Sequence, residues 1–127
     1  MLELEIIGAG PLAEDEVRRL CSRAAASAGV RDGHVAVEFV DARRISELNA
    51  RYRGRRGPTD VLSFPIDGAH PVDGARELGD VVICPEHTVD TREAVVHGVL
   101  HLLGMDHEND AGEMLALQRD LLAPGRD

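Results

Sequence analysis

The segment from His97 to His107 constrains the fold more than any other part of the chain. It reads His97-Gly-Val-Leu-His101-Leu-Leu-Gly104-Met-Asp-His107. Residues four apart on an α-helix lie on one face, so His97 and His101 point the same way. Gly104 follows three residues later, where a glycine can end a helix in the left-handed conformation and reverse the chain. The pattern predicts a helix whose glycine turn brings His107 round to face the first two histidines.

Three neutral imidazoles that face one point are typical zinc ligands. Three protein ligands with an open fourth position characterise catalytic zinc sites, whereas a structural site closes with a fourth cysteine or histidine. Cys84 lies upstream on a predicted strand that can in principle reach the metal, but a small buried thiol is its expected role. We therefore expect one catalytic-type Zn2+ per chain, bound by His97, His101 and His107. The other histidines stand apart in the sequence and are not expected ligands: His34, His70 and His87.

The apolar pattern predicts the secondary structure. Strands are expected at 2–7, 34–40, 61–65 and 78–84, where apolar residues alternate or run together. Helices are expected at 12–28, at 45–52 before Gly54, at 91–103, and from a cap at Asn109 or Asp110 onwards. The order β-α-β-α-β-β-α-α predicts an α+β fold, with a small mixed sheet packed with helices and a zincin-like metal helix followed by a glycine turn. The length of 127 residues fits a single domain, 1–127.

Several local features refine these helices. Asp90 resembles an N-cap, with Glu93 placed to reach back to it. Residues 66–77, rich in glycine and proline, are predicted to form a surface loop that precedes a buried strand. One face of the second helix is predicted to carry Ile45, Leu48, Asn49 and Tyr52. The last helix, with Pro124 beyond its end, is predicted to direct five residues toward the core: Met114, Leu115, Leu117, Leu121 and Leu122.

Charge is unevenly distributed along the chain. The formal net charge is −9, which argues against a general nucleic-acid binder, and no DNA partner is expected. Residues 43–56, however, hold six arginines and one glutamate, a local charge of +5. We predict that this segment forms one basic face beside the zinc. The sequence shows no signal peptide and no apolar run long enough for a membrane span, so a cytoplasmic protein without a membrane partner is expected.

The histidine spacing is also that of the metzincin peptidases, which place a glutamate directly after the first histidine as general base. Here that position holds Gly98, which cannot accept a proton. This argues against peptide hydrolysis. A metallopeptidase-like hydrolase would need a base from elsewhere, such as Glu86 or Glu93.

Three segments together resemble one known family. HGVLHLLGMDH (97–107) is similar to the signature H-G-x-L-H-L-x-G-x-D-H of the bacterial YbeY endoribonucleases. LNARYRGRRGPTDVLSFP (48–65) resembles the family's block L-N-x-x-Y-R-x-x-x-x-P-T-D-V-L-S-F-P, and LGDVVIC (78–84) resembles its strand L-G-D-I-V-I. Only twelve residues (85–96) separate Cys84 from His97, where family members usually have a longer helical stretch. A shorter cleft wall, with an effect on substrate range, is therefore expected.

The resemblance implies a zinc-dependent, single-strand-specific endoribonuclease. Its expected role is late maturation of the 3′ end of 16S ribosomal RNA and ribosome quality control, with single-stranded RNA and ribosomal proteins as partners. The zinc ligands fall on His97, His101 and His107, and the family's essential arginine falls on Arg53. The alternatives are the metallopeptidase-like hydrolase and a non-catalytic, zinc-stabilised ribosome-binding factor.

The roles of the remaining polar residues stay open. The nucleophile is either a water activated by zinc or the ribose 2′-hydroxyl. Asp106 either accepts an N–H from a ligand histidine or caps the turn. Asp60 and Asp80 are expected at turn or strand-edge positions. Thr59 and Ser63 are expected in loops, although their hydroxyls can bind phosphate.

Overall fold

The computed structural model describes residues 2–68 and 72–123. Its sheet consists of β1 (Leu2–Ile7), β2 (Gly33–Phe39), β3 (Val61–Pro65) and β4 (Glu77–Ile83), in the order β1-β2-β4-β3. The strands β1, β2 and β4 are parallel, and β3 pairs antiparallel with β4 at the edge. The sheet is therefore mixed, as predicted.

Four α-helices connect or follow the strands: α1 (Glu14–Ser27), α2 (Ala42–Arg53), α3 (Thr91–Leu102) and α4 (Glu113–Leu122). A short 3-10 helix, η1 (Pro85–His87), lies between β4 and α3. The element order and the mixed sheet confirm the predicted α+β fold. None of the helices in the described ranges is long and apolar enough to cross a membrane.

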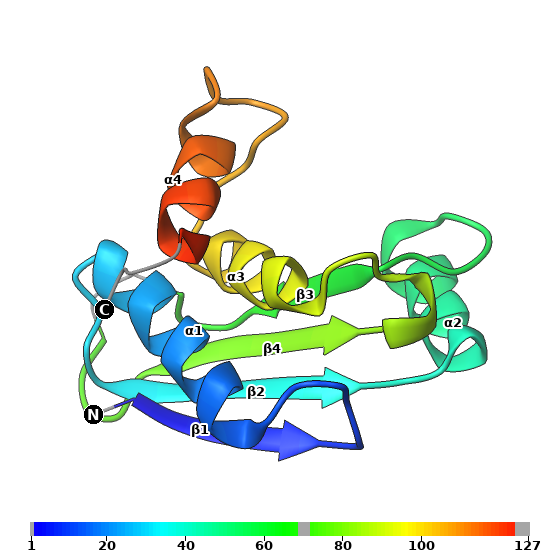
Figure 1. Cartoon of the computed structure of the whole chain (residues 1–127), viewed down its shortest axis with the longest axis horizontal. Helices are drawn as coiled ribbons and strands as arrows, with labels where there is room; N and C mark the ends of the chain where they lie inside the picture. The colour runs from blue at the N-terminus through cyan, green and yellow to red at the C-terminus, as the bar shows by residue number, and fades with distance from the viewer. Residues whose placement is uncertain (1, 69–71, 124–127) are drawn as a thin grey trace.

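The sheet separates two clusters of buried side chains. Successive residues of a strand point to opposite faces, and β4 follows this rule. Val81 and Ile83 belong to the larger cluster, which α1 and α3 cover, whereas Val82 packs with Ile45 and Leu48 of α2. Figure 1 shows α1 and α3 against the same face of the sheet, and α2 beyond the ends of β2 and β4. The helix with the histidines is thus fixed on the sheet, close to the edge strand β3.

The last helix begins later than predicted. Its first residue is Glu113, because the chain turns at Gly112, which has a φ of 101°. The Asp110 carboxylate still accepts hydrogen bonds from the N–H groups of Gly112 and Met114, at 2.8 and 2.9 Å. It therefore binds these early amides from outside the helix.

One predicted core position is wrong. Leu115 is 44% exposed, and Gln118 is buried in the apolar stripe of α4 instead. Tyr52, predicted to share a helical face with Ile45 and Leu48, is 57% exposed, and its ring contacts that of Phe64 on the edge strand. The predictions for His70 and Pro124 lie outside the described residues.

Candidate metal centre

The helix α3 begins at a side-chain cap. Asp90 Oδ1 accepts hydrogen bonds from the N–H groups of Arg92 and Glu93, at 3.0 and 3.3 Å. Within the described residues the Asp90 N–H does not donate in return to the Glu93 carboxylate, so only half of the predicted capping box forms. The cap sets the start of the helix and hence the direction of the histidine face.

The end of α3 turns the chain as the sequence predicts. Gly104 has a φ of 96°, in the left-handed region that favours glycine. Its N–H donates to the carbonyl of His101 at 3.0 Å, and the N–H of Met105 donates to the carbonyl of Leu100 at 3.1 Å. These paired hydrogen bonds form a Schellman motif, and Met105 also packs against the larger core cluster. The reversed chain returns His107 to the histidine face of α3.

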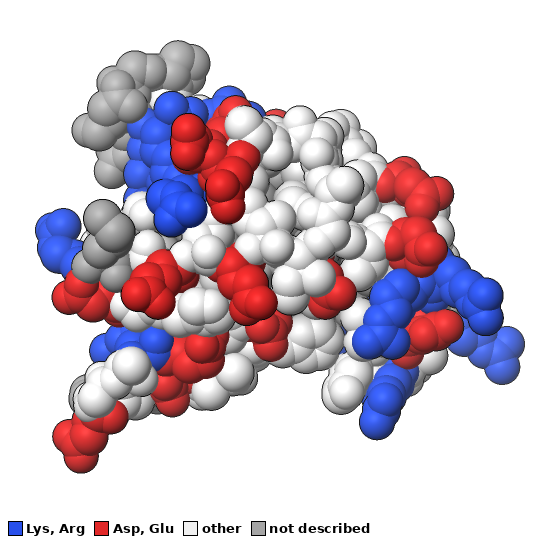
Figure 2. Space-filling view, turned by 90° about the horizontal axis from the view of Figure 1, so that it is seen from below, with Lys and Arg blue, Asp and Glu red and all other residues white. Residues whose placement is uncertain are grey.

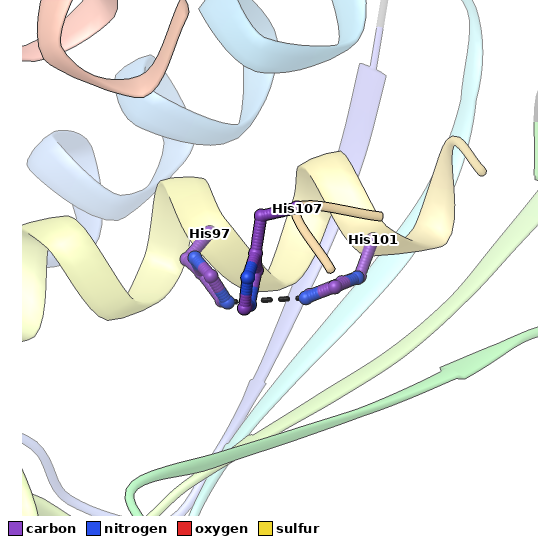
Figure 3. Close-up of side chains that lie close together, drawn as sticks. All are labelled: His97, His101 and His107. Atoms are coloured by element: carbon purple, nitrogen blue, oxygen red, sulfur yellow. Dashed lines mark hydrogen bonds between the residues drawn. The ribbon is translucent and has the colours of Figure 1, made fainter. Parts of the chain in front are cut away.

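The three histidines lie together, as Figure 3 shows. Their ring centroids are 4.6 Å apart for His97 and His101, 5.1 Å for His97 and His107, and 5.5 Å for His101 and His107. One nitrogen from each ring lies within 4.8 Å of the other two. This is the only group of three or more potential metal-ligating side chains that meets this distance within residues 2–68 and 72–123.

Hydrogen bonds fix which ring nitrogens face the common point. His101 Nδ1 lies 2.9 Å from the carbonyl oxygen of Met105, which can only accept, so the nitrogen donates. His97 Nδ1 lies 2.8 Å from Gln118 Oε1 and donates to it. In the neutral rings both Nε2 atoms are therefore lone-pair acceptors. These two atoms are 3.1 Å apart, the contact drawn as a dashed line in Figure 3.

This donor arrangement fits a zinc ion. Two lone pairs at such a distance repel each other unless a cation or a proton lies between them. Tetrahedral zinc with Zn–N bonds of about 2.0–2.1 Å holds its ligand nitrogens about 3.3 Å apart. The separation of the Nε2 atoms of His97 and His101 is close to that value.

Burial favours the metal-binding form of His101. Partial burial and then the neighbouring His97 lower the pKa of His101 below its ordinary value of 6.5, against the opposing hydrogen bond to Met105. A metal binds the neutral imidazole, so a lowered pKa extends metal binding to lower pH.

The histidines open on a cleft with a volume of about 810 Å³. Arg53, the last residue of α2, lines the same cleft, together with Tyr52, Thr59 and residues 60–65. Gly54 ends α2 with a φ of 64° directly after this arginine. The structure therefore brings together the four site residues predicted from the sequence. The short segment 85–96 contributes no residue to the cleft lining, and its effect on substrate range stays a prediction.

The predicted basic face extends only partly to the cleft. Figure 2 shows one group of arginine side chains at the end of the molecule where α2 lies and others at the opposite end, with acidic side chains among and between them. Within the described residues, Arg53 alone of the arginines lines the cleft, together with three acids: Asp60, Asp106 and Glu108. Arg43 and Arg44 instead lie 3.6 and 3.4 Å from Glu47 of their own helix.

The position that holds the base in metzincins is closed by packing. Gly98 lies so near the sheet that a Cβ atom there would be 2.4 Å from Val81 Cγ1 and 3.3 Å from Val61 Cγ2. The alternative bases, Glu86 and Glu93, do not line the cleft. Glu86 Oε1 instead accepts the N–H of Ala42 at 3.2 Å, at the start of α2.

Most of the other polar residues considered as site candidates form hydrogen bonds with main-chain groups. Asp106 accepts from the N–H of Glu108 at 2.9 Å, and this hydrogen bond, followed by one from the Asn109 side chain, lowers the pKa of Asp106. Of its two predicted roles, Asp106 therefore takes the turn cap. Asp60 likewise accepts the N–H of Val61 at 2.8 Å. Ser63 Oγ donates to the carbonyl of Gly98 at 2.9 Å and so joins β3 to α3.

One further predicted role agrees with the structure, and another does not. Cys84 is a fully buried thiol in the smaller cluster beside α2. Asp80, predicted at a turn or a strand edge, instead lies in the middle of β4, an inner strand, with its side chain largely exposed. Partial burial of its carboxyl, followed by the charges of Glu77 and Glu5, raises its pKa. Neither side chain lines the cleft.

Gln118 is the site residue that the sequence prediction missed. It comes from α4, 21 residues after His97, and it is only 5% exposed. A signal was present, because Gln118 occupies a core-facing position between Met114 and Leu121 in an otherwise apolar stripe. A buried amide at such a position needs a hydrogen-bond partner, and here the partner is His97.

Comparisons with known proteins agree with this geometry. The family model described as Endoribonuclease YbeY matches residues 10–125. The endoribonuclease YbeY of Rubrobacter xylanophilus is 40% identical over 124 residues, covering 93% of this chain and 89% of the relative. That of Bacillus cytotoxicus is 39% identical over 128 residues, covering 84% and 82%. The solution structure of TM1509 from Thermotoga maritima is 29% identical, covers 93% of this chain and 85% of that chain, and aligns with a TM-score of 0.54. This chain therefore belongs to the YbeY endoribonuclease family.

Proposed function

We propose that this chain is a zinc-dependent endoribonuclease that cleaves single-stranded RNA, and that residues 1–127 form one metallo-hydrolase domain. One observation carries the proposal. Two Nε2 lone pairs, 3.1 Å apart and fixed by hydrogen bonds at the opposite ring nitrogens, lie with a third imidazole on a cleft that Arg53 also lines. The family's endoribonuclease name supports the same chemistry.

The first part of the proposed mechanism is metal binding by the three histidines. His97, His101 and His107 would hold one zinc ion, and Gln118 and the Met105 carbonyl would keep the first two rings oriented. When bound, zinc is a Lewis acid that lowers the pKa of water and stabilises developing negative charge. Three protein ligands would leave one coordination position of such an ion open for water or substrate.

Arg53 would bind the scissile phosphate. Its planar guanidinium can donate to two phosphate oxygens at once and stabilise charge in the transition state. Its exposed position in the cleft leaves these donors accessible to a substrate. Because Arg53 is the cleft's single arginine within the described residues, phosphate contacts would be few and RNA binding weak and local.

The proposed cellular role is maturation of ribosomal RNA. We expect a cytoplasmic protein that acts late in 16S ribosomal RNA maturation, at the 3′ end, and in ribosome quality control. The acidic remainder of the chain supports a substrate presented by a larger particle, with ribosomal proteins as partners, rather than capture of free RNA.

The test is cleavage of a single-stranded RNA by the purified protein, with and without a chelator. We expect cleavage that the chelator abolishes and added zinc restores, little cleavage of the same sequence in a duplex, and no hydrolysis of casein. The His101→Ala protein serves as the control for a contaminating nuclease. RNA binding without chelator-sensitive cleavage would support the non-catalytic ribosome-binding factor instead. Chelator-sensitive hydrolysis of casein would restore the metallopeptidase alternative.

A further inference from the structure

Tyr52 is an exposed aromatic residue in a chain with few aromatic residues. The sequence contains one tyrosine, two phenylalanines and no tryptophan. Phe39 is buried in the larger core cluster, whereas Tyr52 is 57% exposed and lines the cleft beside the three histidines. Core packing therefore does not account for an aromatic ring at this position.

The ring is held on a fixed support. Tyr52 lies in the last turn of α2, a helix anchored by the buried side chains of Ile45 and Leu48. Its ring meets that of Phe64 on β3, with the centroids 5.2 Å apart and an angle of 71° between the planes. This edge contact is a favourable aromatic geometry and restrains the tyrosine side chain. Phe64 also lines the cleft, so both rings stand at its wall.

An arginine lies over the tyrosine ring. The guanidinium carbon of Arg51 is 5.4 Å from the ring centroid. Arg51 is itself exposed, and a cation over an exposed ring is held only weakly. A flat π-system that stacks on the ring would displace it, because stacking of a base on an aromatic side chain is a stronger contact.

We propose that the Tyr52 ring, supported by Phe64, is a stacking subsite for a nucleobase of single-stranded RNA. The proposal rests on the proposed function and specifies how the substrate is recognised. Arg53 follows Tyr52 directly in the chain, so a phosphate and a base of one strand would meet adjacent residues. The faces of bases in a duplex are covered by their neighbours, and the subsite would therefore select unpaired RNA. Stacking tolerates every base, so little sequence preference is expected.

The single tyrosine makes a direct test possible. With no tryptophan in the chain, the intrinsic fluorescence of the protein comes from Tyr52. The zinc-loaded protein is mixed rapidly with a ten-residue oligouridylate or with an abasic ribose-phosphate oligomer of equal length and charge. We expect quenching by the oligouridylate and not by the abasic oligomer, after correction for absorbance with N-acetyltyrosinamide.

The second readout is binding of the same two oligomers, now carrying a fluorescent label, measured by fluorescence anisotropy. We expect Tyr52→Leu to weaken oligouridylate binding about tenfold and to leave binding of the abasic oligomer unchanged. Tyr52→Phe keeps the ring and should bind within about twofold of wild type. Zinc content and the melting temperature of each variant control for misfolding.

The stacking subsite would be overturned by binding of oligouridylate without quenching, by equal quenching by the abasic oligomer, or by unchanged affinity in Tyr52→Leu. Absence of binding to either oligomer would overturn it as well. Chelator-sensitive cleavage, assayed on the same preparation, separates the two proposals. Cleavage without quenching removes only the subsite, whereas quenching without cleavage removes only the endoribonuclease.

Discussion

His34 and His101 have the same side chain, but their surroundings shift the pKa in opposite directions. His34, at the start of β2, lies 2.7 Å from Glu77 and 3.5 Å from Glu5. The hydrogen bond to Glu77 raises the pKa of His34 above its ordinary value of 6.5. For His101, burial and the neighbouring His97 lower the pKa. Carboxylate partners favour the imidazolium, whereas burial among other histidines favours the neutral ring.

The comparison shows what distinguishes a metal-type histidine group in this molecule. The rings of His97 and His101 each donate through Nδ1 to a neutral oxygen, and their Nε2 lone pairs face the same point. Both nitrogens of His34 instead face carboxylates, so neither is directed at a shared ligand position. His87, on η1, is exposed and belongs to neither arrangement. This agrees with the expectation that His34 and His87 stand apart from the metal ligands.

The largest expected effect comes from removing one ring of the triad. We predict one zinc per wild-type chain and less than about a tenth of that in His101→Ala, since two imidazoles bind zinc far more weakly than three. Metal analysis after dialysis measures this directly. The matched control is His34→Ala, which should keep the wild-type zinc content. Wild-type zinc content in His101→Ala would contradict the site.

The next effect concerns the partner of His97. Gln118→Leu keeps the volume of the side chain but removes the acceptor for Nδ1, so the ring loses its fixed orientation. We expect zinc affinity to fall about 10- to 100-fold, as measured by competition with a chromophoric chelator. Gln118→Glu retains an acceptor oxygen and should lie closer to wild type. If Gln118→Leu lowered only the melting temperature of the zinc-free protein and left zinc affinity unchanged, Gln118 would have a purely structural role.

These residues also show how far the sequence predicts the site. Helical spacing and Gly104 predict the triad because its geometry is local to eleven consecutive residues. The contribution of Gln118 depends on how α4 packs against α3, which local spacing does not encode. Tyr52 shows the same limit, because its place on an apolar face is local whereas its exposure depends on where β3 lies.

A smaller effect is expected from Arg53, the arginine that lines the cleft together with the histidines. Arg53→Lys keeps the charge but loses the two-pronged geometry of the guanidinium. We predict unchanged zinc content and melting temperature, with turnover of single-stranded RNA reduced about tenfold or more. Arg43→Lys, on the same helix but outside the cleft, is the matched control. Wild-type turnover by Arg53→Lys would show that its guanidinium has no special role.

The smallest effect tests the other side of the comparison, the carboxylate-paired histidine. Because the pKa of His34 is raised on folding, the folded state binds its proton more tightly than the unfolded state does. This stabilisation is complete below the ordinary value of 6.5 and disappears as the pH rises through the raised pKa. In His34→Gln the contribution is absent at every pH. The pair is partly exposed, so we expect the melting temperature of wild type to fall between pH 5.5 and 8.5 by only about 1–2 °C more than that of the variant.

Thermal melts of the zinc-free proteins at the two pH values measure this difference, because the two proteins differ only at residue 34 and all other contributions cancel. Glu77→Gln removes the hydrogen-bonded carboxylate that contributes most to the raised pKa of His34, and it should behave like His34→Gln. If wild type and His34→Gln lost stability equally over this range, the carboxylates would not stabilise the imidazolium. The contrast between the two histidines would then rest only on the burial of His101 and its neighbour His97.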